Sequence, residues 1–185
     1  MKQTITIILL LFVFNAFSQH ASLKVIMIRH GEKNDATGNL SCQGLHRALM
    51  LPKVLNAKFP KVERIYAPSL NNGKVPDHAR MFQTITPYAV QNSLAIDTKY
   101  KVSDAAGVAK EVMSKKGLVL LVWEHGNIPD IAKALGVTTP NLQWGSNDFD
   151  SIWIVTYAKD KNGNWVASLS TADKEGLNPP TTCNF

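Results

Sequence analysis

The segment LKVIMIRHGE, residues 23–32, joins a short apolar run to a polar exit. Between Leu23 and Ile28 the apolar run is broken only by Lys24. Continuous runs of this length are typical of strands that are buried on both faces of a largely parallel sheet. The sequence therefore predicts a central strand here, with Arg29-His30-Gly31-Glu32 directly after its carboxyl end.

A second run of the same kind, Leu118 to Trp123, is followed by Glu124-His125-Gly126. Reactive residues in open α/β sheets gather just after the carboxyl ends of the strands. Each histidine is followed by a glycine, which lets the backbone turn sharply and approach a ligand closely. We therefore expect His30 and His125 to meet at one end of the sheet.

The rest of the chain alternates helical and strand-like segments, in the order of an α/β protein. Helices are predicted where apolar positions recur with helical spacing or a cap precedes them: Gln43 to Ala57, His78 to Val90, Asp104 to Ser114, and Pro129 to Leu135. Further strands are predicted at Glu63 to Ala67, Ala95 to Ile96, Ile152 to Tyr157, and Trp165 to Leu169. The sum is a three-layer α/β/α sandwich with a mostly parallel central sheet and a C-terminal antiparallel hairpin. Its turn lies at Lys161 to Asn164.

The N-terminus has the pattern of a signal peptide. Lys2 precedes an uncharged apolar run, Ile5 to Phe17, which ends in small or polar residues around Ser18. We expect residues 1–18 to be removed and residues 19–185 to form one domain, periplasmic or secreted. No cysteine follows the run, so the mature protein is expected to have no stable membrane anchor.

Charge and cysteine content limit the classes of partner. The formal net charge is +6, but the basic residues are scattered and do not alternate with aromatic residues, which argues against a nucleic-acid binder and leaves some attraction for anions. Cys42 and Cys183 permit one internal pairing, and the sequence leaves open whether they form a disulfide or remain thiols. Neither has a second ligand at zinc spacing, so no metal site is predicted.

Three segments in order resemble the motifs of the histidine phosphatase superfamily, which includes phosphoglycerate mutases and acid phosphatases. They are Arg29-His30-Gly31-Glu32, then Tyr66 to Ser69 with His78 to Thr84, and finally His125-Gly126. The resemblance, to a small branch of the superfamily, spans Leu23 to about Tyr157. It implies that phosphate is bound by Arg29, Arg80 and His125, and that His30 is the nucleophile. It implies neither a metal nor a cofactor.

These residue types suit phosphoryl transfer, in which catalysis is mostly positioning and electrostatic stabilisation. Arg29 and Arg80 can grip phosphate oxygens with planar forks of donors, and a neutral His30 can attack phosphorus to give a phosphohistidine. Glu32 is interpreted as structural, because a carboxylate beside the phosphate would repel it. The other histidines, His20, His46 and His78, are given no catalytic role, although His78 could line the pocket.

The general acid that protonates the leaving oxygen is the open part of the mechanism. Acid phosphatases of the superfamily carry an aspartate directly after the second histidine, where this chain has Gly126. The alternatives are Glu124, Asp97, or no acid at all. Glu124 adjoins His125, but neighbouring residues on a strand point to opposite faces, so it could face away. Asp104 is interpreted as a helix cap.

The chain lacks long insertions, and Ala36 stands six residues after His30 where mutases carry an asparagine, which argues against mutase activity. The sequence predicts an exported, metal-independent phosphomonoesterase acting on a small phosphate ester. A phosphohistidine protein phosphatase and a silent phosphate-binding protein of the same fold are the alternatives. The oligomeric state stays open. Asp148 and Asp150 are interpreted as turn formers, and Leu177 to Phe185 as an irregular tail that Cys183 could pin.

Overall fold

A computed structural model describes residues 22–70 and 79–183 of the 185-residue chain. Its centre is a six-stranded sheet in the order β3-β2-β4-β1-β5-β6. The strands are β1 (Leu23–Arg29), β2 (Val62–Tyr66), β3 (Ile96–Asp97), β4 (Gly117–Trp123), β5 (Ser151–Lys159) and β6 (Trp165–Lys174). The helices are α1 (Cys42–Lys58), α2 (Ala79–Gln91), α3 (Ala105–Met113) and α4 (Ile128–Ala134).

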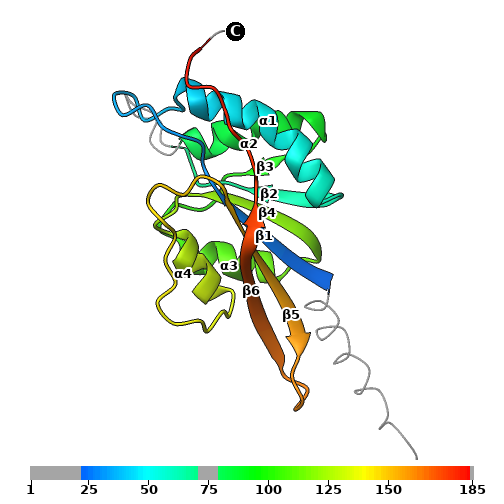
Figure 1. Ribbon diagram of the computed structural model, residues 1–185. Coiled ribbons are helices and arrows are strands. Elements are labelled where there is room, and N and C mark those ends of the chain that lie inside the picture. The colour runs from blue at the N-terminus through cyan, green and yellow to red at the C-terminus, as the bar shows by residue number, and fades with distance from the viewer. Residues whose placement is uncertain (1–21, 71–78, 184–185) are drawn as a thin grey trace, which may run out of the picture.

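The sheet has a parallel half and an antiparallel half. The pairs β1 with β4, β2 with β4 and β2 with β3 are parallel, whereas β5 pairs antiparallel with β1 and with β6. Figure 1 shows α1 and α2 on one side of this sheet and α3 and α4 on the other. The predicted three-layer α/β/α sandwich with a C-terminal antiparallel hairpin is confirmed.

Strand β1 is buried on both faces, as its continuous apolar run predicts. Alternate side chains enter opposite layers: Val25 and Met27 belong to the core under α3 and α4, and Ile26 and Ile28 to the core under α1 and α2. All four side chains are fully buried. The two cores enclose β1 from both faces and so fix the position at which its last residue, Arg29, leaves the sheet.

Strands β1 and β4 end at the same level, which brings their polar exits together. Their register runs from Leu23 opposite Gly117 to Arg29 opposite Trp123. The ladder continues one step further, because the backbone N–H of His30 donates to the carbonyl of Trp123 over 3.1 Å. The residues that follow both strands are therefore neighbours, as the sequence predicts for the two histidines.

Two helices start at side-chain caps, of which Asp104 was predicted. Ser41 accepts a hydrogen bond from the Gly44 N–H at the start of α1, and Asp104 accepts one from the Gly107 N–H at the start of α3. Helix α1 continues through Pro52, and α4 has Pro129 in its first turn. The predicted helix from His78 begins at Ala79 in the part of the chain that is described, so His78 lies outside it.

Several predicted strand boundaries are wrong. Strands β2 and β3 are displaced by one residue from their predicted positions, and β6 extends to Lys174 instead of ending at Leu169. Strand β6 is an edge strand with one unpaired side, so polar residues fit there without an apolar alternation to reveal them. The signal peptide predicted at residues 1–18 lies outside the described residues. No helix of the described chain is long and apolar enough to cross a bilayer.

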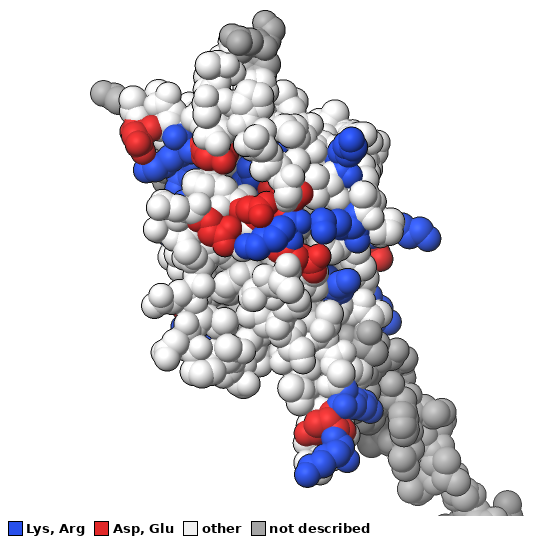
Figure 2. All heavy atoms as spheres, in the orientation of Figure 1, with Lys and Arg blue, Asp and Glu red and all other residues white. Residues whose placement is uncertain are grey.

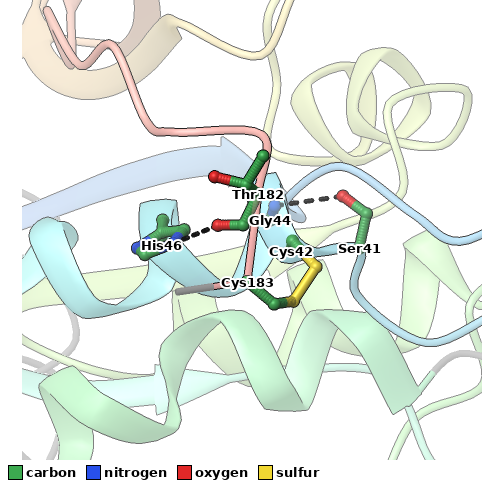
Figure 3. The surroundings of a disulfide bond; sticks show 6 residues. All are labelled: Ser41, Cys42, Gly44, His46, Thr182 and Cys183. Atoms are coloured by element: carbon green, nitrogen blue, oxygen red, sulfur yellow. Dashed lines mark hydrogen bonds between the residues drawn. A yellow bond between two sulfur atoms is a disulfide. The ribbon is translucent and has the colours of Figure 1, made fainter. Parts of the chain in front are cut away.

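Beyond β6 an irregular tail crosses back to α1, as predicted for the described part of the tail. Cys183 forms a disulfide with Cys42 in the first turn of α1 (Figure 3). Close to it, the ring of His46 contacts the carbonyl of Thr182 at 2.9 Å through Nε2. Acidic and basic side chains are interspersed on the face of the molecule shown in Figure 2.

Candidate active site

His30 stands at the carboxyl end of β1 and is only 2% exposed. Its Nε2 lies 3.0 Å from Nε of Arg80, and its Nδ1 lies 2.6 Å from the Gly31 carbonyl oxygen. An arginine Nε can only donate and a carbonyl can only accept, so the proton of the ring must be on Nδ1. Nε2 is therefore the unprotonated nitrogen, and its lone pair accepts from Arg80. An imidazole in this form can act as a nucleophile once the donor turns to another acceptor.

The surroundings of His30 keep the ring neutral. Burial lowers its pKa from the ordinary 6.5 to about 3; the Gly31 carbonyl opposes this shift, and the guanidinium groups of Arg80, Arg29 and Arg47 add to it. At neutral pH the lone pair on Nε2 is available without any loss of a proton.

Arg29 adjoins His30 and is partly engaged by the protein itself. Its Nη1 donates to the carbonyl of Ser146 over 2.5 Å and, more weakly, to that of Asp148 over 3.3 Å. Its guanidinium carbon lies 3.7 Å from the ring centroid of Phe149. Nε is buried and has no partner among the described residues. Arg29 thus anchors the loop before β5 and keeps donor capacity for an anion.

The pKa of Arg29 is lowered to about 10, first by burial and then by the neighbouring charge of Arg47, so the group stays charged at neutral pH. A cation that is partly stripped of water attracts an anionic group more strongly than an exposed one. Arg29 is therefore suited to the phosphate-binding role that the sequence predicts.

Arg80 lies in the first turn of α2, and Thr84 connects this helix to the loop after β1 that carries His30 and Gly31, here called the His30 loop. The hydroxyl of Thr84 accepts from the Gly31 N–H over 2.8 Å and donates to the Arg80 carbonyl over 2.7 Å. Thr84 is fully buried. The sequence placed Thr84 in the second motif but gave it no role. The structure shows it fixing Arg80 relative to His30.

His125 and Glu124 follow β4 on the same end of the sheet. Burial and then the charge of Arg29 lower the pKa of His125, and its Nδ1 is buried without a partner in the described chain. Glu124 lies one residue beyond the end of β4, and its backbone carbonyl accepts from the N–H groups of Asn127 and Ile128. Because Glu124 is no longer in the strand, strand alternation does not decide where its side chain points. Its Oε1 lies 4.0 Å from Nη2 of Arg80. Glu124 therefore faces the site, whereas the sequence left open that it points away.

The structure does not bring Asp97 to His30. Asp97 is exposed at the end of the edge strand β3, and β2 and β4 separate that strand from β1. Its carboxylate accepts from the Lys99 N–H over 2.9 Å, which is the geometry of a turn. Of the two acids proposed from the sequence, only Glu124 contacts a residue of the site.

Two residues behind His30 were not anticipated. Arg47 of α1 is 1% exposed and donates through Nη1 and Nη2 to the Arg29 carbonyl, over 3.1 and 3.0 Å. The same guanidinium forms a two-pronged ion pair with Glu175 of the tail, in which Nε donates to Oε2 over 2.7 Å and Nη2 donates to Oε1. The peptide that carries His30 is thus held from behind by a buried ion pair.

The loop before β5 forms another wall of the site. Asp148 accepts at Oδ1 from the N–H groups of Asp150 and Ser151, which confirms that it forms a turn. The loop places the ring of Phe149 in a T-shaped contact with that of His30, with 6.2 Å between the ring centroids. No cluster of three or more histidine, cysteine or carboxylate side chains suited to a metal ion occurs within residues 22–70 and 79–183.

The arrangement of elements defines a class of fold. Solved phosphatases share this fold, among them a protein histidine phosphatase. One similar structure is a mycobacterial hydrolase, at 15% identity with a TM-score of 0.58, covering 84% of this chain and 93% of that one. A mycobacterial glucosyl-3-phosphoglycerate phosphatase is also 15% identical, with a TM-score of 0.55, covering 80% of this chain and 97% of that one.

A third similar structure is the protein histidine phosphatase SixA complexed with tungstate. Its identity is 15% and its TM-score 0.50, over 80% of this chain and 97% of that one. No protein-family model and no curated protein sequence matches the chain. The likeness is therefore one of fold.

Proposed function

We propose that this protein is an exported phosphomonoesterase that works through a phosphohistidine on His30. The observation that carries the proposal is the neutral ring of His30, with its Nε2 lone pair directed at Arg80. Two further groups with unused donors or buried nitrogens, Arg29 and His125, adjoin the same site. The same site therefore offers a phosphate dianion positive charge, which would bind its oxygens, and a nucleophile, which would attack phosphorus.

The proposed reaction has two displacements at phosphorus. First, Nε2 of His30 forms a bond to phosphorus as the bond to the ester oxygen breaks, and that oxygen takes a proton from the acid form of Glu124. Water then attacks the phosphohistidine and gives up a proton to Glu124, and the N–P bond breaks to release phosphate and the free ring. Arg29, Arg80 and His125 hold the phosphoryl oxygens in both steps. No metal or cofactor is required by this scheme.

Fold relatives support the phosphate chemistry. The glucosyl-3-phosphoglycerate phosphatase has also been solved with inorganic phosphate, and SixA with tungstate, an oxyanion of the same shape as phosphate. SixA is a protein histidine phosphatase, which keeps a phosphohistidine protein as an alternative substrate for this chain. We favour a small ester, because the proposed export separates this chain from cytosolic phosphorelay proteins.

Export to the periplasm or the medium is part of the same proposal. It rests on the basic start and apolar run of residues 1–18. The disulfide between Cys42 and Cys183 supports it, because disulfides persist in oxidising compartments and are rare in the cytosol.

The test is phosphate release by residues 19–185 from a panel of phosphate esters and a phosphohistidine peptide, measured without and with a metal chelator. His30→Ala is compared with His46→Ala, a matched change of a histidine at the tail contact. We expect turnover of small esters by the wild type and by His46→Ala, and none by His30→Ala. Phosphate binding by a folded wild-type protein without turnover would identify a silent binding protein instead. Loss of turnover in the chelator would contradict the metal-free reaction.

A further inference from the structure

Phe149, in the loop before β5, contacts two groups of the proposed reaction. The guanidinium carbon of Arg29 lies 3.7 Å from the centroid of its ring, which is a stacking distance. The ring of His30 makes a T-shaped contact with it, with 6.2 Å between the centroids and an interplanar angle of 69°. The phosphate-binding cation and the nucleophile thus share one aromatic neighbour, to which the proposed reaction gives no role.

Arg29 is held by groups that carry no net charge. Its Nη1 donates to the carbonyls of Ser146 and Asp148, and the ring of Phe149 lies against its guanidinium. Among the described residues, no carboxylate forms an ion pair with Arg29. Carbonyl dipoles and the quadrupole of a ring immobilise a cation without cancelling its charge. A carboxylate in the same place would compete with phosphate for that charge.

The two carbonyl contacts restrain only one end of the guanidinium. Both are made by Nη1, while Nε is buried without a partner in the described chain. A planar group that is anchored at one nitrogen can still tilt about that nitrogen, which changes the angle at which its donors meet a phosphate oxygen. A ring stacked against the plane prevents the tilt and leaves the donors at the edges of the plane free. Phe149 is therefore the contact that sets the orientation of the guanidinium.

The backbone on both sides of Phe149 is itself fixed. Before it, the carbonyl of Asp148 accepts from Nε1 of Trp144 over 2.8 Å. After it, the N–H of Asp150 donates to Oδ1 of Asp148 over 3.0 Å, and the carbonyl of Asp150 accepts from the Glu175 N–H over 2.7 Å. A side chain can hold another group in place only if its own position is held. The turn gives Phe149 that support.

We propose that Phe149 is a positioning residue, which keeps the guanidinium of Arg29 oriented for phosphate beside His30 and leaves its charge unpaired. Phe149 acts through Arg29, so it needs no contact with phosphate itself. The inference rests on the phosphatase function proposed above. It requires an aromatic ring at position 149, and not simply an apolar side chain.

The first test is the affinity for inorganic phosphate, measured by titration calorimetry on variants whose thermal unfolding shows that they fold. Phe149→Leu and Phe149→Met each remove the ring and keep an apolar side chain. We expect both to weaken phosphate binding by about ten-fold, the scale of a partly desolvated cation–π contact. Phe82→Leu is the matched control, because Phe82 is also half-buried but lines a hollow beside β3. It should leave the affinity unchanged.

The second test asks whether the effect runs through Arg29. It compares kcat/KM for 4-nitrophenyl phosphate in Phe149→Leu, in Arg29→Met and in the double variant. Changes at residues that act through one another are not additive. We therefore expect Phe149→Leu to lower kcat/KM by about ten-fold when Arg29 is present and by less than about two-fold when it is methionine. A purely structural role of Phe149 would give the same factor in both backgrounds.

The outcomes separate this inference from the phosphatase function. If the wild type turns over its esters and the two ring-less variants bind phosphate as tightly as it does, the role of Phe149 is overturned and the phosphatase function stands. Equal factors in the two backgrounds overturn that role as well. If the wild type binds phosphate without turnover, the phosphatase function is contradicted, and the calorimetry alone decides the role of Phe149. A folded wild type that neither binds phosphate nor releases it overturns both.

Discussion

The front and the back of the loop that carries His30 use the same residue type in opposite ways. At the back, Arg47 donates hydrogen bonds through Nε, Nη1 and Nη2 to the Glu175 carboxylate and the Arg29 carbonyl. At the front, Arg80 donates Nε to His30 and holds Glu124 only at 4.0 Å, and Arg29 keeps a buried Nε without a partner in the described chain. An arginine whose donors are all bonded within the protein stabilises the fold. An arginine with unpaired donors can bind an anionic ligand.

The difference has an energetic basis. Breaking a buried ion pair by removing one partner leaves an uncompensated buried charge. Removing Arg80 leaves the neutral ring of His30 and the carboxylate of Glu124, which is 31% exposed and 4.0 Å away, so no fully buried charge loses its partner. The two sides should therefore respond differently to the same substitution.

The most direct test of this comparison is one arginine substitution at the front of the loop and one at the back. Arg47→Met should lower the free energy of unfolding by about 3–5 kcal/mol, because it strands the carboxylate of Glu175 in the core. Arg80→Met should leave the unfolding free energy nearly unchanged and lower kcat/KM by about 10²-fold or more, the usual effect of losing one donor to the transition state. Denaturant unfolding and phosphate release measure the two quantities.

A double variant is the control for the back of the loop. Arg47→Met with Glu175→Leu removes both charges, and apolar replacements of a buried pair are often neutral. We expect the double variant to unfold at a higher denaturant concentration than Arg47→Met alone. A double variant that is less stable than either single change would contradict the account of Glu175 as a stranded charge.

The disulfide provides the next test, because it closes the tail that carries Glu175. Cys42 and Cys183 are 141 positions apart, and cross-links that close long loops typically stabilise by about 2–4 kcal/mol. The variant Cys42→Ser with Cys183→Ser should lose stability of this order and keep most of its turnover, since both sulfurs lie at the back. A reductant should lower the melting temperature of the wild type and leave that of the variant unchanged. If turnover falls as far as in Arg80→Met, the separation of front from back is wrong.

The sequence predicted the parts of this comparison that local patterns encode. Strands β1 and β4 were visible because strands buried on both faces have continuous apolar runs. His30, His125, Arg29 and Arg80 were visible because each lies in a short motif at the end of a strand or the start of a helix. The second half of β6 was missed, because an edge strand can be polar throughout.

The back of the loop was missed because its parts are far apart in the chain. Arg47 and Glu175 are separated by 128 positions, and an arginine on a helix has the same local pattern whether it is exposed or buried. The direction of Glu124 depended on where β4 ends, since one residue more of strand would have turned the side chain to the other face. Only the folded chain shows which carboxylate meets which arginine.

The smallest expected effect is on the pH dependence of the unfolding free energy, through the titration of His30, whose pKa is affected by arginines on both sides of the loop. Its pKa is about 3 in the folded protein, lowered first by burial and then by Arg80 at the front and by Arg29 and Arg47, against an ordinary 6.5. Below about pH 6.5 the unfolded chain therefore binds a proton that the folded chain does not. The contribution of this group to stability is present in full above that pH and is lost as the pH falls toward 3, at up to about 1.4 kcal/mol per unit.

Between pH 6 and pH 5 the wild type should accordingly lose about 1 kcal/mol more unfolding free energy than His30→Gln, which has no titrating ring. Titration of all other groups, His125 included, is common to both proteins and cancels in the difference. Denaturant unfolding at the two pH values measures it. Equal slopes for the two proteins would mean that the ring binds its proton as readily in the folded chain as in the unfolded one. Burial and the neighbouring arginines would then not lower the pKa of His30 in the folded chain.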